Sequence, residues 1–165
     1  MKIGIAIRRF LAPGWLVSSH LRRKFAALVS PRAEVEISPF LSMGREARIG
    51  AFTKIKASSG PVRIGERTVI GSHCFVAGHD TGIEIGDDCE IGPHVSIVGV
   101  NYRYDRVDQT FREQGVFSKG VTRIGNGVRI GAGAAILDGA DIRDGAVVKP
   151  RAVVSGRVQA RPPAA

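Results

Sequence analysis

A large, mostly branched apolar residue recurs at every sixth position over most of this chain. A period of six is neither the 3.6-residue period of a helix face nor the alternation of a half-buried strand. It fits a short strand, a corner and another short strand stacked on the coil below, which is the hexapeptide form of a parallel β-helix. The repeating positions are Ile37, Met43, Ile49, Ile55, Ile64, Ile70, Val76, Ile85, Ile91, Ile97, Ile124, Ile130, Ile136, Ile142, Val148 and Val154.

Two companion positions support this interpretation. A small residue stands two places before many of the large ones, as Thr53 does before Ile55, and leaves room for it in a narrow core. Glycine directly follows several of them, and we expect it to supply corner angles that a Cβ would forbid. With three hexads per coil, the sequence predicts an all-β column of about five coils at the usual strand spacing. The glycines are Gly50, Gly65, Gly71, Gly86, Gly92, Gly125 and Gly131.

The net charge of +9 lies mainly in the first 33 residues, which hold seven basic residues and no acidic one. Such an arm suits an anionic lipid surface or a glycan, and nucleic acid is not expected because no binding motif accompanies the charge. Residues 15–29 predict a short amphipathic helix with Val17, Leu21, Phe25 and Leu28 on one side. Packing of this helix on the column or on a neighbouring subunit is favoured over contact with a membrane, which stays open.

The two cysteines, Cys74 and Cys89, both occupy the small position before a large residue, so we expect them to pack inside the column. They lack CxxC spacing, and no signal peptide or stretch of about 20 apolar residues is evident. These features favour a reducing compartment and predict a cytoplasmic protein, with peripheral membrane contact through the basic arm as the alternative.

The hexad count slips in three places. Short insertions follow Ile55 and Val76, and 27 residues separate Ile97 from Ile124. A long polar loop projecting from a rigid stack is where recognition or catalysis is usually found. The sequence therefore predicts a basic, partly helical arm over residues 1–33, a β-helix over 34–156 with a projecting loop over 98–123, and a tail over 157–165.

From residue 35 to about 156 the chain resembles the hexapeptide-repeat acyltransferases, and it is similar to sugar O-acetyltransferases of polysaccharide biosynthesis. The stretches that match best are 101–104, 111–115, 118–120 and 124–133. The resemblance implies a left-handed parallel β-helix that assembles as a homotrimer, with acyl-CoA in the groove between neighbouring columns. It also implies transfer of an acetyl group from acetyl-CoA to a hydroxyl or amine of a sugar or glycan, without a metal.

At the positions that supply the catalytic base, this sequence departs from the family pattern. Related loops carry two histidines before the tyrosine, whereas this chain has Asn101 directly before Tyr102 and no histidine there. Tyrosine is a poor replacement, because an unperturbed phenol has a pKa of about 10. Val76 precedes Ile97 by one coil, so the corner after Val76 should lie beneath the projecting loop, about 4.8 Å lower. His79 lies in that corner and is predicted as the catalytic base.

The remaining site residues follow from the same argument and from the resemblance. Asp80 is predicted to orient the imidazole, with Asp105 as the alternative. The loop residues predicted to shape the acceptor site are Asn101, Tyr102, Tyr104 and Asp105. The resemblance places the CoA-lining turn at Ala132, Gly133 and Ala134, with Lys149 and Arg151 as partners for the CoA phosphates.

Two other functions stay open. The empty histidine positions favour a non-catalytic β-helix that binds a glycan or a partner protein through its loop. The histidines at 73, 79 and 94 invite comparison with the γ-class carbonic anhydrases, in which histidines bind zinc between subunits. Their spacing does not match that family, and a catalytic zinc needs about three converging ligands, so the sequence predicts no metal site.

Overall fold

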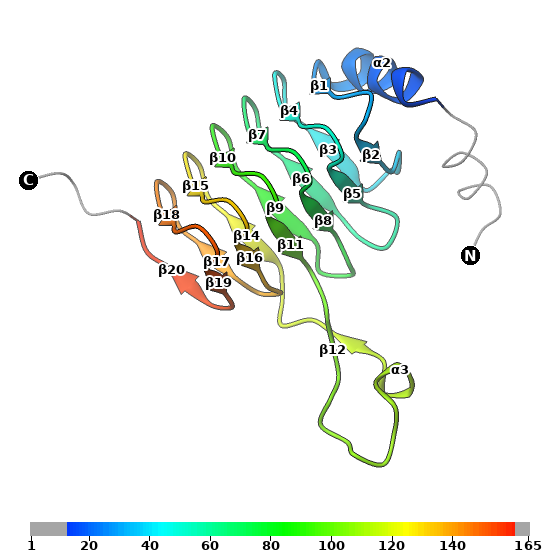
Figure 1. The fold of residues 1–165 in the computed structure, drawn as a ribbon, viewed down its shortest axis with the longest axis vertical. Coiled ribbons are helices and arrows are strands. Elements are labelled where there is room, and N and C mark those ends of the chain that lie inside the picture. Colours follow the sequence, from blue (N-terminus) through cyan, green and yellow to red (C-terminus); the bar gives the residue numbers. More distant parts are fainter. Residues whose placement is uncertain (1–12, 161–165) are drawn as a thin grey trace, which may run out of the picture.

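The computed structural model describes residues 13–160, which form a three-sided column of parallel strands (Figure 1). Each side of the column is a six-stranded sheet, and neighbouring strands in a sheet are one coil apart in the sequence. The column therefore has six coils, one more than the hexad count predicts. The prediction of an all-β repeat column is confirmed.

We name the three sides in the order in which the chain visits them. The first face holds β1 (Leu28–Val29), β4 (Arg48–Ile49), β7 (Val69–Ile70), β10 (Glu90–Ile91), β15 (Arg129–Ile130) and β18 (Val147–Val148). The second face holds β2 (Glu34–Val35), β5 (Lys54–Lys56), β8 (Phe75–Ala77), β11 (Ser96–Val98), β16 (Ala135–Ile136) and β19 (Val153–Val154). The third face holds β3 (Leu41–Met43), β6 (Val62–Ile64), β9 (Ile83–Ile85), β14 (Thr122–Ile124), β17 (Asp141–Ile142) and β20 (Arg157–Val158).

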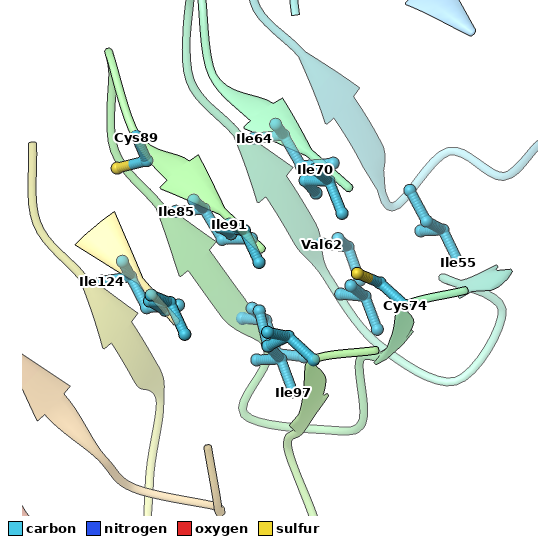
Figure 2. Close-up of a cluster of buried hydrophobic side chains, with 14 of the residues drawn as sticks. Ile55, Val62, Ile64, Ile70, Cys74, Ile85, Cys89, Ile91, Ile97 and Ile124 are labelled. Carbon is cyan, nitrogen blue, oxygen red and sulfur yellow. The ribbon is translucent and has the colours of Figure 1, made fainter. Parts of the chain in front are cut away.

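The core of the column is a stack of the repeating large residues. Each strand has only two or three residues, and alternate side chains point inward and outward. Ile55, Ile70 and Ile97 are fully buried, and Figure 2 shows how such side chains from successive coils fill the interior. Burial of this continuous apolar stack holds short strands that would not be stable alone.

Three corners join the faces, and we number them by the faces that they join. Corner 1 leads from the first face to the second and includes residues 50–53, 71–74, 92–95, 131–134 and 149–152. Corner 2 leads from the second face to the third and includes residues 57–61, 78–82, 99–121 and 137–140. Corner 3 leads from the third face to the first face of the next coil and includes residues 65–68, 86–89, 125–128 and 143–146.

The structure corrects the expected role of the repeating glycines. Gly50 and Gly92 are not in the left-handed region, but a Cβ on Gly50 would lie 2.6 Å from the backbone carbon of Gly71, and one on Gly92 would lie 2.8 Å from the backbone nitrogen of Ala132. Close approach of the next coil, rather than an unusual backbone angle, therefore requires glycine there. The left-handed angles occur two residues later and are adopted by non-glycine residues such as His73 and His94.

The first coil starts earlier than the sequence predicts. β1 at Leu28 already belongs to the column, six residues before the expected start at residue 34. The expectation that Ile37 is the first core position is wrong, because Ile37 is 40% exposed and Val35 is buried in its place. Val35 pairs with Ile55 in the register of the second face, which fixes it as the inward residue.

The helix α2 (Gly14–Phe25) covers the start of the column (Figure 1). Leu21 is fully buried, and Val17 and Phe25 pack against the same core, so the predicted packing of this helix on the column is confirmed. The helix ends earlier than expected, at Ala26 in the left-handed conformation, and Leu28 lies in β1. No helix within residues 13–160 has the length and apolar character needed to cross a bilayer.

Candidate functional site

The projecting loop leaves the column at corner 2, between β11 and β14 (Figure 1). Ile97 pairs with Val76 and Val98 pairs with Ala77 in parallel register. The corner after Val76 therefore lies directly next to the root of the loop, as the hexad count predicts. This stacking brings His79 and the loop together although 20 residues separate His79 from Gly99.

His79 lies against the backbone at the root of the loop. A Cβ on Gly99 would be 3.2 Å from the backbone nitrogen of His79, and Gly99 donates a hydrogen bond to Ala77 O at 3.0 Å. The His79 side chain is 28% exposed, and its Nδ1 lies 3.4 Å from Asp80 Oδ2. Asp80 is 83% exposed, so this pair is open to solvent on the side of the carboxylate.

Hydroxyl groups close the other end of the loop. Thr81 Oγ1 lies 2.8 Å from Ser118 Oγ and donates to Gly120 O at 3.0 Å. Thr122, which starts the next strand, donates its backbone N–H to Gly82 O at 3.2 Å. The corner that holds His79 is thus bonded to the point at which the loop returns. The sequence argument missed Thr81 and Ser118, because hydroxyl residues in corners carry no distinctive pattern.

A buried carboxylate lies on the opposite side of the loop root. Asp138 is 1% exposed, and its Oδ2 accepts a hydrogen bond from the backbone N–H of Lys119 at 3.0 Å. Its Oδ1 is buried and has no hydrogen-bond partner among the described residues. Asp138 was also missed, although Ile136 pairs with Ile97 and the stacking argument that found His79 applies to it equally.

The loop itself is a short hairpin with a helical turn. β12 (Asn101–Tyr102) pairs in antiparallel fashion with β13 (Val116–Phe117), and α3 (Phe111–Gln114) lies between them. Three of the predicted acceptor residues line a shallow hollow on this loop, whereas Asp105 does not. Tyr102 and Tyr104 are 61% and 68% exposed, so their rings are free to stack on a ligand. The hollow is lined by Asn101, Tyr102, Tyr104, Phe111 and Arg112.

The residues predicted to bind CoA lie at corner 1, on the opposite edge of the second face. Ala132, Gly133, Lys149 and Arg151 are at the surface there. Ala134 is buried, 1% exposed, and its side chain faces the core. Within one chain, the second face separates this group from His79 and the loop. The structure therefore does not bring the two halves of the predicted site together in a single protomer.

The two cysteines are core residues, as predicted. Cys74 and Cys89 are 2% and 1% exposed, and Figure 2 shows both among the buried side chains. The Cys74 thiol lies 3.2 Å from Gly92 O and the Cys89 thiol lies 3.0 Å from Gly125 O. Burial raises the pKa of both thiols, because the low-polarity interior disfavours the thiolate.

The three histidines of the column do not converge. His73 and His94 stack on each other at corner 1, whereas His79 lies at corner 2. Across residues 13–160 no group of three or more His, Cys, Asp or Glu side chains is placed to hold a metal ion.

The outward side chains differ between the faces. On the third face Glu84 lies between Arg63 at 3.6 Å and Arg123 at 3.3 Å, forming a ladder of alternating charge. Corner 3 adds the bidentate Arg67–Asp88 pair, with both hydrogen bonds at 2.6 Å. This pairing lowers the pKa of Asp88 and raises that of Arg67. From β8 onward the outward residues of the second face are uncharged: Phe75, Ala77, Ser96, Val98, Ala135 and Val153.

Comparison with known families agrees with the repeat. Residues 122–156 match the family described as bacterial transferase hexapeptide (six repeats), and residues 61–100 match the hexapeptide repeat of succinyl-transferase. The chain carries hexapeptide repeats over both stretches. No curated protein sequence matches it significantly.

Solved structures show the same fold. A mutant of AntD, an N-acyltransferase from Bacillus cereus, in complex with dTDP and coenzyme A, is similar with a TM-score of 0.73 and 22% identity over 86% of this chain and 80% of that one. A second AntD mutant, in complex with dTDP-4-amino-4,6-dideoxyglucose and coenzyme A, gives 0.70 and 20% over the same shares. The likeness identifies the hexapeptide-repeat column as a left-handed parallel β-helix, as the resemblance implied.

Proposed function

We propose that this protein is a CoA-dependent acyltransferase that moves an acetyl group to a hydroxyl or amine of a sugar in glycan biosynthesis. The observation that carries the proposal is the position of His79 beneath the root of the projecting loop, fixed by the pairing of Val76 with Ile97. The matches to transferase hexapeptide families, and the CoA and dTDP-sugar bound by similar structures, support the same chemistry.

His79 has the surroundings of a general base. Its Nδ1 faces the carboxylate of Asp80, so Nδ1–H would point toward Asp80 and leave the lone pair of Nε2 free. Nε2 takes the proton of the acceptor hydroxyl or amine as the acceptor oxygen or nitrogen attacks the thioester carbonyl. The C–S bond then breaks, and the imidazolium returns the proton to the CoA thiolate.

The hollow on the loop is the proposed acceptor site. Asn101 supplies amide groups for hydroxyls, and the exposed rings of Tyr102 and Tyr104 supply flat surfaces for a sugar. We retain Asp105 as a carboxylate at the rim of this site, outside the hollow itself. Corner 1 would hold the donor, with Lys149 and Arg151 near the CoA phosphates and the turn at Ala132 and Gly133 lining the CoA groove.

A homotrimer would complete the site. The donor and acceptor residues lie on opposite edges of the second face, so one chain cannot close a site around both substrates. In a cyclic trimer, corner 1 of one protomer meets the loop of the next. The outer surface of the second face, which is uncharged from β8 onward, suits such a contact better than the charged ladder of the third face.

Calorimetry with acetyl-CoA, followed by thiol release assays with a panel of nucleotide sugars and free sugars, tests the proposal. We expect binding, and turnover that His79→Gln reduces by about 100-fold or more. His20→Gln, on the exposed side of α2, is the matched control and should keep full activity. Absence of acetyl-CoA binding at millimolar concentration, or full activity of the His79→Gln protein, would overturn the proposal.

One observation favours a second function. The root of the loop lacks the two histidines that related loops carry before the tyrosine, and the His79–Asp80 pair is open to solvent. A non-catalytic β-helix that binds a glycan through the same loop fits these features. Binding of a nucleotide sugar without turnover over the whole panel would select this function.

We further propose a cytoplasmic location with peripheral contact to anionic membranes through α2. Trp15 is 61% exposed, and the last turn of α2 carries Arg22, Arg23 and Lys24 with no acidic residue in its first turn. Sedimentation with phosphatidylserine vesicles should pellet the protein, and Arg22→Glu with Arg23→Glu should abolish pelleting. Equal pelleting of both proteins would exclude this contact.

A further inference from the structure

Corner 1 contains a continuous column of equivalent residues. Phe52, His73, His94, Gly133 and Arg151 follow one another from coil to coil, each in the left-handed conformation with φ of 59°, 58°, 58°, 69° and 59°. The same backbone bond links them: His94 donates to Ser72 O at 3.0 Å, Gly133 to Pro93 O at 2.9 Å and Arg151 to Ala132 O at 2.9 Å. Side chains at these positions must therefore project in the same direction.

The side chains of this column form a ladder of stacked rings. The rings of Phe52 and His73 lie 4.9 Å apart with an interplanar angle of 25°. The rings of His73 and His94 lie 5.0 Å apart with an angle of 11°. These separations equal the rise of one coil, so the ladder places one flat group per coil on the surface of corner 1.

The ladder is interrupted at Gly133. A Cβ on Gly133 would meet only Arg151 Cγ, at an ordinary contact distance of 3.6 Å, so the place of a side chain is open. The left-handed angle does not require glycine here, because Phe52, His73, His94 and Arg151 adopt it with full side chains. The interruption leaves two coil rises, about 9.6 Å, between the level of His94 and that of Arg151. This separation is larger than the thickness of one planar ring, about 3.4 Å, and the Arg151 side chain, with Cγ 3.6 Å from the place of a Gly133 Cβ, takes up part of it.

The surroundings of this gap select an anion. Within residues 30–33, 50–53, 71–74, 92–95, 131–134 and 149–152, corner 1 has no acidic residue and has cations at Arg32, Lys149 and Arg151. Lys149 and Arg151 are exposed and adjacent to the gap. A flat ring carrying phosphates would stack on His94 and the Arg151 guanidinium while its phosphates pair with these cations.

We propose that the gap at Gly133 binds the base of a phosphorylated nucleotide, between the imidazole of His94 and the guanidinium of Arg151. The inference deepens the proposed acyltransferase function and rests on it for the identity of the nucleotide. The base is either the adenine of CoA or the pyrimidine of a nucleotide sugar, since both present the same flat face and phosphates.

The test fills the gap with a side chain. Calorimetry measures the binding of adenosine 3′,5′-bisphosphate, of dTDP and of 4′-phosphopantetheine, which lacks a base, to the intact protein and to Gly133→His. The added ring would continue the ladder and occupy the place of the base, so we expect about 10-fold or greater loss of affinity for the base-containing ligand. Phosphopantetheine affinity should stay unchanged.

Gly145→His is the matched control. Gly145 has the same left-handed angle, with φ of 67°, and open space around its Cβ, but it lies at corner 3. It should bind every ligand as the unaltered protein does. If Gly133→His does not fold, His94→Ala removes the ring on one side of the gap and should weaken the same ligand, whereas His73→Ala leaves His94 in place and should not.

The outcomes separate the ligands and the two proposals. Loss confined to adenosine 3′,5′-bisphosphate assigns the gap to CoA, and loss confined to dTDP assigns it to the acceptor nucleotide. Equal loss of phosphopantetheine affinity would show that the pantetheine arm, not a base, crosses Gly133, and would overturn the inference. Unchanged affinity for both bases would also overturn it while leaving the acyltransferase proposal intact if acetyl-CoA still binds.

Discussion

The carboxylate of Asp138 accepts a hydrogen bond from the backbone N–H of Lys119 at 3.0 Å and fixes the point at which the projecting loop rejoins the column. The same edge of the column holds His79 on the coil below the loop. The loop is thus clamped from both sides, by the corner of His79 through Thr81 and by Asp138. Its position relative to the candidate base is set by the stack of coils.

Removal of this clamp should destabilise the protein. Asp138→Ala leaves the Lys119 N–H without its partner in a partly buried place, and we expect a loss of about 1–3 kcal/mol in the free energy of unfolding. Urea denaturation measures it. Asp144→Ala is the control, because Asp144 makes the same kind of bond to Asn126 N–H at 2.8 Å at an exposed corner and should cost less. If the Asp138→Ala protein is as stable as the unaltered protein, Asp138 does not clamp the loop.

Asp138→Asn should have the opposite effect. The asparagine keeps one oxygen to accept the hydrogen bond from Lys119 N–H. It replaces a carboxylate whose other oxygen, Oδ1, is buried without a partner among the described residues. A buried charge that is not fully paired is costly, so the free energy of unfolding should stay the same or rise. A loss as large as that of Asp138→Ala in the same urea experiment would show that the charge itself is needed.

The core stack predicts the largest stability change. Ile97 is fully buried and pairs with Val76 below and Ile136 above. Ile97→Ala should lower the free energy of unfolding by about 2–5 kcal/mol, because it leaves a cavity between three coils. Ser96→Ala, an outward position in the same strand, is the control and should change it little. Similar values for the two variants would mean that position 97 does not lie in a packed core.

The repeat could be found in the sequence because a stacked column imposes the same environment every six residues. Ile97, Val76 and Ile136 were placed correctly, and so was the corner of His79. The first coil was missed because the hexad count slips there. Val29 and Val35 are six residues apart, but Met43 follows Val35 after eight, so a count of six back from Met43 reaches the exposed Ile37. The glycine positions were found, but their cause is the close approach of the next coil, which only the three-dimensional packing shows.

The candidate site was less predictable than the column. The loop has no sequence period. The hairpin of β12 and β13 and the hollow beside Phe111 depend on contacts that no sequence pattern predicts. Asp138 was within reach of the stacking argument, yet a single aspartate in a corner looks like an ordinary turn residue. The ring ladder was hidden because Phe52, His73 and His94 are 21 residues apart, a spacing that has meaning only once the coil length is known.

The buried thiols should resist alkylation. Burial raises the pKa of Cys74 and Cys89, so the reactive thiolate is scarce at neutral pH and is also covered. Because the pKa of each thiol is higher in the folded state, the protonated thiols favour folding. Their contribution to the free energy of unfolding is complete below the pKa of the unfolded thiol and falls as the pH rises through the folded pKa. Mass spectrometry after iodoacetamide treatment at pH 8 should show no adduct on the native protein and two on the denatured one. Rapid labelling of the native protein would show that the core opens.

The helical turn of the loop should be sensitive to acid. Glu113 accepts hydrogen bonds from the Thr110 backbone N–H at 2.9 Å and from its hydroxyl at 2.8 Å, and these lower the pKa of Glu113. A depressed pKa means that the capping contribution is present above the pKa of the unfolded chain, about 4.3, and is lost as the pH falls through the folded value. The amide chemical shifts of residues 110–114 should therefore change as the pH falls below about 5 and the cap is lost, while the amide shifts of the column stay unchanged.

The control is Glu113→Gln, which keeps a hydrogen-bond acceptor but does not titrate, so its amide shifts should not follow this transition. The same acid transition in the Gln variant would assign the change to another group, such as Asp108 in its pair with Arg106.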